Sequence, residues 1–476
     1  MMRKLRKASG EEIRFSNFPV SFQVFSPVLP FRSVVCFCFK IDGSKGGLIV
    51  SLSRKDLRTL FTDPSLPLFM LLVGAFFLTM FFRISATVVL PLEGARLGMS
   101  AALTGFISSL HFYTYAFMQP VSGILHDRYG PLRVVTWGLV VTAVSCLLLT
   151  FVRTPLSLGA WRLLSGLGVS PMYSATLVFQ AFAFPPERYC FYAGINFALS
   201  NMGAIVSSAP LGFFLDTLGM PSTFALLAGV SLAMAWQIRR KAHADPMRTG
   251  SGPSRQPGKI SSIFPEILRA IFFIFRNPRL LSMLILWAVS SASLLAFQGL
   301  WGASWFSEAF GASPSSGRFW SSLISVGMMF GPVLTAGMAI TPAGLPGAIR
   351  RACTANALSW LILLGVVATR LSISAAGGAA FLVGITSGFR GVFAMAGVTS
   401  LAKKGQKGAV FGAMNMMVVL TAVIFQWGTG LIINWFPGPA AGTYDASGYM
   451  AAFLAVSAAM GVSLLSFRML GRTPME

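Results

Sequence analysis

The sequence predicts an all-α membrane protein with twelve transmembrane helices in two pseudo-symmetric six-helix bundles. Its composition and its pattern of apolar runs both lead to this class. Of the 476 residues, 55% are hydrophobic and only 11% are charged, whereas soluble domains carry about 25% charged residues. Most of the surface is therefore expected to face lipid. The net charge of +23 arises mainly between the apolar runs, so it indicates membrane topology and not nucleic-acid binding.

The apolar runs set the expected helices. A helix needs about 20 mostly apolar residues to cross a hydrocarbon core of about 30 Å. The runs that reach this length are 67–91, 100–125, 132–152, 156–183, 190–214, 220–238, 279–303, 316–340, 349–369, 374–398, 409–434 and 448–468. An even number of spans places both termini on one side. Because most of the 37 Lys and Arg residues fall on that side and cytoplasmic loops are enriched in them, we expect a cytoplasmic (inner) membrane protein with cytoplasmic termini.

This pattern divides the chain into five parts. We expect a cytoplasmic tail at 1–66 (disordered, or added by an upstream start site), bundles at 67–238 and 279–468, a basic cytoplasmic linker at 239–278, and a tail at 469–476. The linker ends in SSIFPEILRAIFFIFRNPR, where charges interrupt an apolar run. That pattern is typical of a helix lying in the membrane interface.

The most specific motif joins the second and third expected spans. The segment GILHDRYGPLR, Gly123–Arg133, resembles the G-x-x-x-D-R-x-G-x-R signature of the major facilitator superfamily. The resemblance implies alternating access, with a gate on one side formed by Gly123, Asp127, Arg128, Gly130 and Arg133. Gly123 and Gly130 lack side chains and can allow close packing and a tight turn.

Two further segments resemble the same superfamily. LGAWRLLSGLG, Leu158–Gly168, is similar to its fourth-helix motif, with Arg162, Gly166 and Gly168 in register. FFRISATVVLP and FYTYAFMQPVSGILHDRYGP are similar to a bacterial branch that contains phagosomal nutrient transporters. The fourth-helix motif implies that its arginine faces the central cavity.

Three arginines, Arg83, Arg162 and Arg390, lie in the interior of expected spans, away from their ends, and no Asp or Glu lies there. A charge at the bilayer centre costs about 2.5 to 3.5 kcal/mol, so these residues are expected to face a cavity. With no acid beside them, an anionic solute is the expected counter-charge, since guanidinium matches carboxylate and phosphate. Each could instead be a structural arginine bonded to helix carbonyls or stacked on an aromatic ring.

Neutral polar residues within the spans are further candidate ligands. His111, Tyr115 and Gln119 recur at i, i+4 and i+8 and so share one helix face. The second half supplies Gln298, Asn415 and Gln426. Any of these side chains could equally bond one helix to another. His111 and Glu93 are candidate proton carriers. Imidazole changes charge near neutral pH, and Glu93 is an acid at the outer end of the first expected span.

These features favour a secondary transporter for a small organic anion or zwitterion, such as a carboxylate, an organophosphate or an amino acid. Expected partners are that solute, membrane lipid, and a coupling proton or counter-anion, with the chain acting as a monomer. No cofactor or metal is expected. A multidrug or metabolite exporter of the same fold is the alternative, although such carriers often bear a buried acid. A receptor or an enzyme is less favoured, since the chain has no large soluble domain, paired carboxylates or Cys/His cluster.

Overall fold

The computed structural model describes residues 63–151, 154–184, 189–242, 260–336, 344–401, 407–438 and 443–470. These residues are helical apart from short turns and one isolated bridge between Pro437 and Tyr444. Residues 1–62, 243–259 and 471–476 lie outside the described residues. They hold most of the two expected tails and the middle of the expected linker, whose first residues, Arg239–Lys241, end α9.

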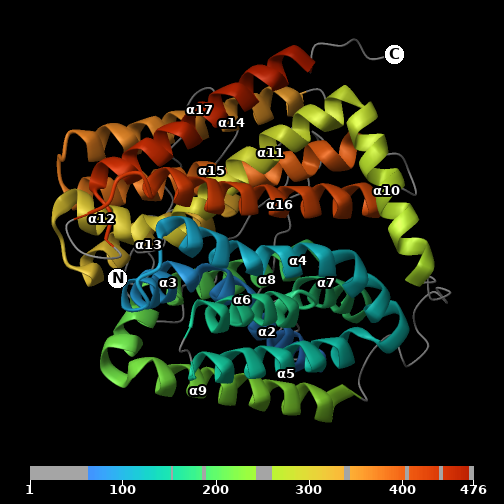
Figure 1. Cartoon of the computed structure of the whole chain (residues 1–476). Coiled ribbons are helices and arrows are strands. Elements are labelled where there is room, and N and C mark those ends of the chain that lie inside the picture. The colour runs from blue at the N-terminus through green and yellow to red at the C-terminus, as the bar shows by residue number, and fades with distance from the viewer. Residues whose placement is uncertain are drawn as a thin grey trace, which may run out of the picture. The chain divides into compact units, whose positions relative to one another are not determined.

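The helices form two sets that follow each other along the chain (Figure 1). The first set is α2 (Leu66–Ile84), α3 (Ala86–Arg96), α4 (Ala101–Tyr129), α5 (Pro131–Leu149), α6 (Pro155–Val169), α7 (Met172–Ala183), α8 (Tyr189–Val206) and α9 (Ala209–Lys241). The second set is α10 (Ile260–Arg276), α11 (Pro278–Ala296), the π-helix η4 (Phe297–Trp301), α12 (Gly302–Phe310), α13 (Pro314–Ala336), α14 (Leu345–Ala368), α15 (Ile373–Leu401), α16 (Lys407–Ile433) and α17 (Ala446–Leu470). Most packing, such as α5 on α9 and α13 on α15, is within a set.

Two helices that carry site residues begin at side-chain caps. The hydroxyl of Ser100 accepts a hydrogen bond from the N–H of Leu103 at the start of α4. The side chain of Asn277 accepts bonds from the N–H groups of Arg279 and Leu280 at the start of α11. These bonds satisfy donors that a first helical turn leaves without partners, so they help to fix where each helix starts.

Glycines with positive φ make the sharp turns of the first set. Gly130 (φ 83°) separates α4 from α5, and Gly219 (φ 75°) divides α9 into two pieces, with Pro221 in the second. This backbone conformation is easy only for glycine. The fifth expected span therefore covers α8 and the first piece of α9, and the sixth covers the second piece.

By length and apolar composition, eight of the described helices could cross a membrane, with α2–α3 and α11–η4–α12 each counted as one. The expected number of twelve is not confirmed and stays a prediction. The remaining expected spans fall at α4, α6 with α7, α8 and α13. The fourth expected span is broken before Pro171 into helices of 15 and 12 residues, and α4 carries the polar face described below. A break shortens a helix, and polar side chains lower its apolar content.

The two sets meet where α4 lies beside α16 (Figure 1). A Cβ on Gly105 would lie 2.4 Å from the carbonyl oxygen of Gln426, and one on Gly430 would lie 2.5 Å from that of Ala101. Both contacts lie toward the end of the helices that carries α3 and α12, which we call the α3 end. The opposite end, crossed by α10, is the α10 end.

More contacts join the two sets at the α3 end. The Tyr444 hydroxyl donates to the carbonyl of Met99 (3.1 Å), and Arg318 of α13 forms an ion pair with Asp216 of α9. The carbonyl of Arg318 also accepts a bond from the hydroxyl of Ser208 (3.1 Å). The α3 end is therefore closed by polar contacts as well as by the packing of glycines.

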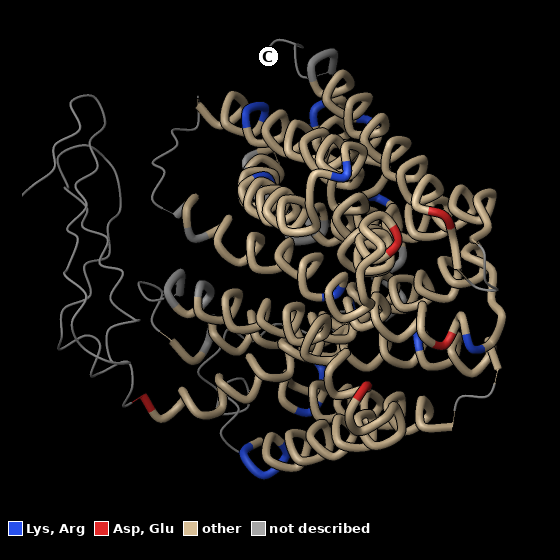
Figure 2. The backbone as a smooth tube through the Cα atoms, turned by 90° about the vertical axis from the view of Figure 1, so that its left-hand side faces the viewer, with Lys and Arg blue, Asp and Glu red and all other residues tan. Residues whose placement is uncertain are grey.

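Charged residues are sparse along the described backbone (Figure 2). Within the described residues, ion pairs join Glu93 to Arg96 and Asp216 to Arg318. Neither pair contains Arg83, Arg162 or Arg390.

Candidate functional site

Arg83 lies beside an interruption of the first expected span. α2 ends at Ile84 and α3 begins at Ala86, and the hydroxyl of Ser85 between them donates to the carbonyl of Phe82 (3.2 Å). The Arg83 side chain is half-buried, and its Nε is buried without a hydrogen-bond partner among the described residues. A buried donor without an acceptor is costly, so this Nε lacks an acceptor, among the described residues, that its position calls for.

The polar face of α4 lies next to Arg83. The Tyr115 side chain is within electrostatic range of Arg83 and interacts with the Gln119 side chain. The His111 and Tyr115 rings stack with centroids 6.2 Å apart. Gln119 Nε2 is a second buried donor without a partner among the described residues. The structure thus brings four of the candidate residues together and leaves two of their donors unused.

A short hydrogen-bond chain fixes the orientation of His111. Its Nδ1 lies 3.0 Å from Ser165 Oγ, and the Ser165 hydroxyl donates to the carbonyl of Arg162 (2.9 Å). Because the only hydroxyl proton of Ser165 is used there, we assign the donor role to His111 Nδ1. Nε2 is then the acceptor of the neutral ring and the atom that would take up a proton.

Arg162 makes the contacts of the structural alternative. Its Nε and Nη2 donate to the carbonyl of Ser108 (3.2 and 2.9 Å), and its Nη1 donates to the carbonyl of Phe82 (2.9 Å). The residue is fully buried, and the guanidinium lies 5.4 Å from the centre of the Trp161 ring. These bonds tie α6 to α2 and α4, with each nitrogen already engaged.

The glycines of the fourth-helix motif lie at helix crossings. A Cβ on Gly166 would lie 2.2 Å from the carbonyl oxygen of His111 and from Oγ1 of Thr114, and one on Gly168 would lie 2.9 Å from the carbonyl oxygen of Gly138. Separations this short exclude any side chain. The motif therefore packs α6 closely against α4 and α5. This packing fixes the position of α4, and so of His111, along the helix axis.

The second set places a π-helix near the interruption of the first span. The amide of Gln298 in η4 is half-buried and donates to Ser325 Oγ of α13 (2.7 Å). The hydroxyl of Thr87 in α3 donates to the carbonyl of Leu300 in η4 (3.1 Å). π-Helices often occur at functional sites. Here two irregular segments, one from each set, are in direct contact.

The two candidates on α16 lie at different levels. Gln426 is fully buried, its Nε2 donates to the carbonyl of Leu295 (3.1 Å), and its Oε1 has no partner among the described residues. Gly299 lies between Gln426 and the Arg83 backbone. A Cβ on Gly299 would lie 3.1 Å from Gln426 Nε2 and 3.7 Å from the carbonyl oxygen of Arg83. Asn415 is half-buried. At 1.5 Å per residue, it lies about 16 Å from Gln426 along the axis of α16. The structure brings Gln426, but not Asn415, near Arg83.

Arg390 lies in the second set between α11 and α15. Among the described residues, the contacts of its Nη1 and Nη2 are long, each 3.4 Å, with the carbonyl of Trp287 and the hydroxyl of Ser291. Its Nε is buried without a partner among the described residues, and Cys353 of α14 is within electrostatic range. Arg390 is therefore a second under-bonded cation, with contacts separate from those of Arg83.

The expected gate residues lie at the α10 end. Gly130 makes the turn from α4 to α5, as the motif predicts. Arg128 and Arg133 are exposed. Among the described residues, no atom lies within 4 Å of a Cβ position on Gly123, so the close packing expected there is absent. The side chain of Asp127 lies outside the described residues, and the gate itself stays a prediction.

Glu93 lies at the α3 end, away from the α4 face. Its side chain is mostly buried and pairs with the half-exposed Arg96. Sequence reasoning did not single out Ser165, Ser325 or Thr87, which are too common as residue types to stand out. Ser165 had one local signal, since it lies one helical turn after Arg162. The others act across contacts that only the fold creates.

Residues 71–426 match the Major Facilitator Superfamily. A probable anion transporter 3, chloroplastic, from Arabidopsis thaliana is 30% identical over 157 residues, which are 32% of this chain and 30% of that protein. A probable sulfoacetate transporter, SauU, from Cupriavidus necator is 25% identical over 157 residues, 33% of this chain and 36% of that protein. The chain spans about a third of the length of these relatives.

Solved structures resemble the fold over most of its length. The nucleoside transporter NupG gives a TM-score of 0.65 at 15% identity, covering 86% of this chain and 100% of that one. A bacterial homolog to the human lysosomal transporter Spinster, inward-facing and unoccupied, gives 0.66 at 14% identity, covering 86% and 98%. At these identities the likeness establishes the fold alone.

Proposed function

Because this chain belongs to the Major Facilitator Superfamily, we propose that it moves a small organic anion or zwitterion across the cytoplasmic (inner) membrane by alternating access. The family makes it a membrane transporter and not an enzyme. The solute class, the membrane and the mechanism are our proposal. Carboxylates, organophosphates and amino acids are the classes that we favour.

The observation that carries the proposal is that the buried Nε of Arg83 has no acceptor among the described residues. Its Nε and the neighbouring Gln119 Nε2 are buried donors without acceptors among the described residues. Neither described ion pair contains Arg83. A solute with carboxylate or phosphate oxygens would supply both acceptors and charge, and charge-assisted hydrogen bonds are the stronger kind. A cationic solute would meet repulsion from Arg83 and find no acid beside it in the described residues.

The three interior arginines receive different roles in this proposal. Arg83 is the primary anion ligand, supported by Tyr115, Gln119 and His111. Arg390 is a second cation that would attract an anion toward the second set, since its existing contacts are long. We reassign Arg162 from substrate ligand to structural brace, because carbonyl oxygens already engage each of its nitrogens.

Gln298 and Gln426 are the proposed ligands from the second set. Gln298 lies on the π-helix that contacts the first set through Thr87 and Leu300, and Gln426 retains an unused acceptor oxygen. An acceptor beside the arginine would accommodate a hydroxyl or ammonium group of the same solute. Because a cation and an acceptor oxygen could bind opposite ends of one solute, the proposed solute class includes zwitterions. Asn415 is kept only as a candidate nearer the α10 end.

Names of relatives point the same way. The relatives from Arabidopsis thaliana and Cupriavidus necator are named as transporters of anions and of sulfoacetate. Each name describes that protein, and each match covers about a third of it. They support an anionic solute without selecting one.

For the transport cycle, we propose that the two helix sets rock about this site, as expected for carriers built from repeats. Contacts such as Tyr444–Met99 and Arg318–Asp216 would close the α3 end in this conformation. The motif around Asp127 would close the opposite, cytoplasmic end in the other conformation. A solute drives the exchange only as far as its affinities for the two states differ.

A thermal-stability screen of the purified protein tests the proposal. Carboxylates, organophosphates, amino acids, nucleosides and lipophilic cations are added to the parent protein, Arg83→Gln, Arg390→Gln and the control Arg350→Gln. Arg350 is exposed at the start of α14, so the control removes the same charge elsewhere. A ligand at a hundredfold excess over Kd stabilises the folded state by about 2.7 kcal/mol.

We expect an anion to stabilise the parent and the control, and to lose this effect in Arg83→Gln. Transport of that anion by reconstituted vesicles then establishes carrier activity. Stabilisation by lipophilic cations that persists in Arg83→Gln would overturn the anion proposal in favour of an exporter of the same fold.

A further inference from the structure

α10 crosses the α10 end of both helix sets (Figure 1) and leads through Asn277 directly into α11. It contacts α4 of the first set and α11 and α16 of the second. Since α11 begins an apolar segment long enough to cross a membrane, Pro278–Phe310, α10 must lie close to the level at which that segment enters the bilayer.

One face of α10 is packed against the junction of the two sets. Ile267 and Ile271 pack on an apolar cluster that includes Ala116 of α4 and Val419 of α16. Ile274 is fully buried in a second cluster formed by helices of the second set. Separation of α4 from α16 at this end would therefore move or uncover this face of α10.

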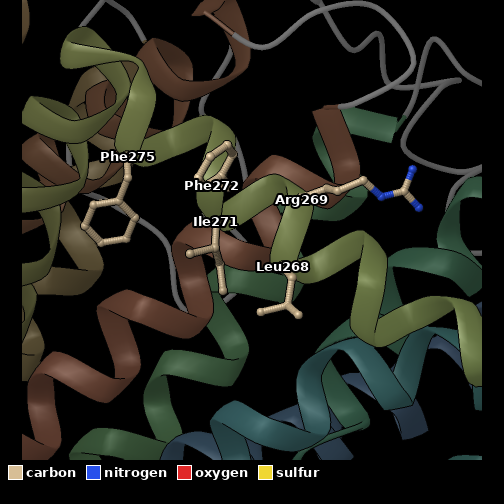
Figure 3. Close-up of a pocket in the computed structure, with 5 residues that line it drawn as sticks. All are labelled: Leu268, Arg269, Ile271, Phe272 and Phe275. Atoms are coloured by element: carbon tan, nitrogen blue, oxygen red, sulfur yellow. The ribbon is translucent and has the colours of Figure 1, made fainter.

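A different face of α10 exposes large apolar side chains. Leu268, Phe272 and Phe275 are 50%, 57% and 56% exposed, and their spacing of four and three residues places them on one stripe. With Arg269 and Ile271 they line a shallow, open hollow (Figure 3). Arg269 extends outward in this view, and the guanidinium of Arg276 lies 4.2 Å from the centre of the Phe272 ring.

The chemistry of this face fits one kind of partner. Three half-exposed apolar side chains favour an apolar phase, and Arg269 and Arg276, seven residues apart, form a basic stripe beside them. Amphipathic helices with this combination lie with the apolar stripe at the acyl boundary and the basic stripe at the headgroups. The helix has one acid, Glu266, so its excess of charge is positive.

We propose that α10 binds the surface of an anionic membrane through Leu268, Phe272 and Phe275, with Arg269 and Arg276 at the lipid headgroups. The helix then acts as a strap that couples this surface to the separation of α4 and α16. Membrane binding by α10 does not depend on which solute is carried. The effect of this binding on transport rests on the proposed function.

The contact is tested on the full chain in vesicles of phosphatidylcholine with added phosphatidylglycerol. In a variant without native cysteines, a nitroxide is placed at position 269, 272 or 275, one at a time. We expect the labels at 272 and 275 to be more accessible to oxygen than to a water-soluble nickel chelate, and to lie deeper than the label at 269. Equal exposure of all three labels to the nickel chelate would overturn the proposal. So would spin–spin broadening between copies, which would show a second chain on this face.

The headgroup preference is tested with Arg269→Gln/Arg276→Gln against the control Arg350→Gln/Arg351→Gln. Each arginine near an anionic surface favours the bound position by about fivefold. Adding phosphatidylglycerol should therefore deepen the label at 272 in the control and have much less effect in the α10 variant. An equal response of both variants would overturn the role of these arginines. If depth responds but transport does not, the membrane contact holds and the strap's effect on transport is wrong.

Discussion

Arg318 in α13 donates to the carboxylate of Asp216 in α9, so an ion pair joins the two helix sets at the α3 end. The Arg318 side chain is 10% exposed and that of Asp216 is 54% exposed. A Cβ on Gly212 would lie 2.4 Å from Arg318 Nε, so the guanidinium lies directly over a glycine of the other set. In the proposed cycle this contact opens, so the buried charge of Arg318 is positioned to set the balance between the two conformations.

Asp216→Asn is expected to favour separation at the α3 end. Half-exposed ion pairs contribute about 0.2 to 1 kcal/mol, so the ratio of open to closed conformation should rise by a factor of about 1.4 to 5. The measurement is the distance distribution between spin labels at the exposed residues Thr217 and Ser315. Asp445→Asn is the control, since Asp445 is exposed at the same end and bonds Ser447 within its own turn. An unchanged distribution in Asp216→Asn would contradict a role for the pair.

Gly212→Ala is expected to act on the same contact by a different route. The added methyl group would occupy the position of the Arg318 guanidinium, and overpacking typically costs about 1 to 3 kcal/mol. The same spin labels should report a larger open population than in Asp216→Asn. Gly229→Ala, in the same helix, is the control, because no atom of the described residues lies within 4 Å of a Cβ position there. A Gly212→Ala protein with the parent distribution would show that Arg318 can move aside freely.

Arg162→Gln is expected to destabilise the fold without removing solute binding. The substitution leaves the carbonyls of Ser108 and Phe82 short of donors, and each unsatisfied buried group costs about 1 to 3 kcal/mol. The unfolding temperature should fall, while the increment on adding solute remains. Arg83→Gln should show the opposite pattern. The idea is wrong if Arg162→Gln unfolds at the parent temperature and no longer responds to the solute.

Local signals predicted part of this architecture. The turn at Gly130 follows from a motif whose glycine must adopt positive φ, and the shared face of His111, Tyr115 and Gln119 follows from helical periodicity. The family resemblance carried by the Gly123–Arg133 and Leu158–Gly168 segments is confirmed. These features depend on residues within a few helical turns of one another, so they can be predicted from local sequence.

Other features depend on contacts that the sequence does not state. Arg162 lies in its expected span, but only the fold reveals that Phe82 and Ser108 supply its acceptors. The pairing of Asp216 with Arg318 joins residues of different helix sets. The π-helix at Phe297–Trp301 contains Gly299, which packs against Gln426 of another helix, and no periodic pattern in the sequence marks a π-helix.

Coupling to protons should depend on His111 and not on Glu93. His111 Nε2 is the ring nitrogen that can take up a proton in our assignment, and the ring is within electrostatic range of Arg83 and Arg162. An anion held by Arg83 would offset these positive charges and so favour a proton on His111, and by linkage the proton would favour the anion. The Glu93 carboxylate is instead engaged by Arg96 at the α3 end.

The measurement is solute uptake by vesicles under an imposed pH gradient, compared with exchange of labelled for unlabelled solute without a gradient. His111→Gln should lose most gradient-driven uptake and keep exchange, because the solute ligands at Arg83 remain. Glu93→Gln should keep both. If the His111→Gln protein still concentrates solute on a pH gradient, the coupling proton travels elsewhere. If the parent shows exchange alone, the carrier is an anion exchanger, and His111 only orients Ser165 and the neighbouring Tyr115 ring.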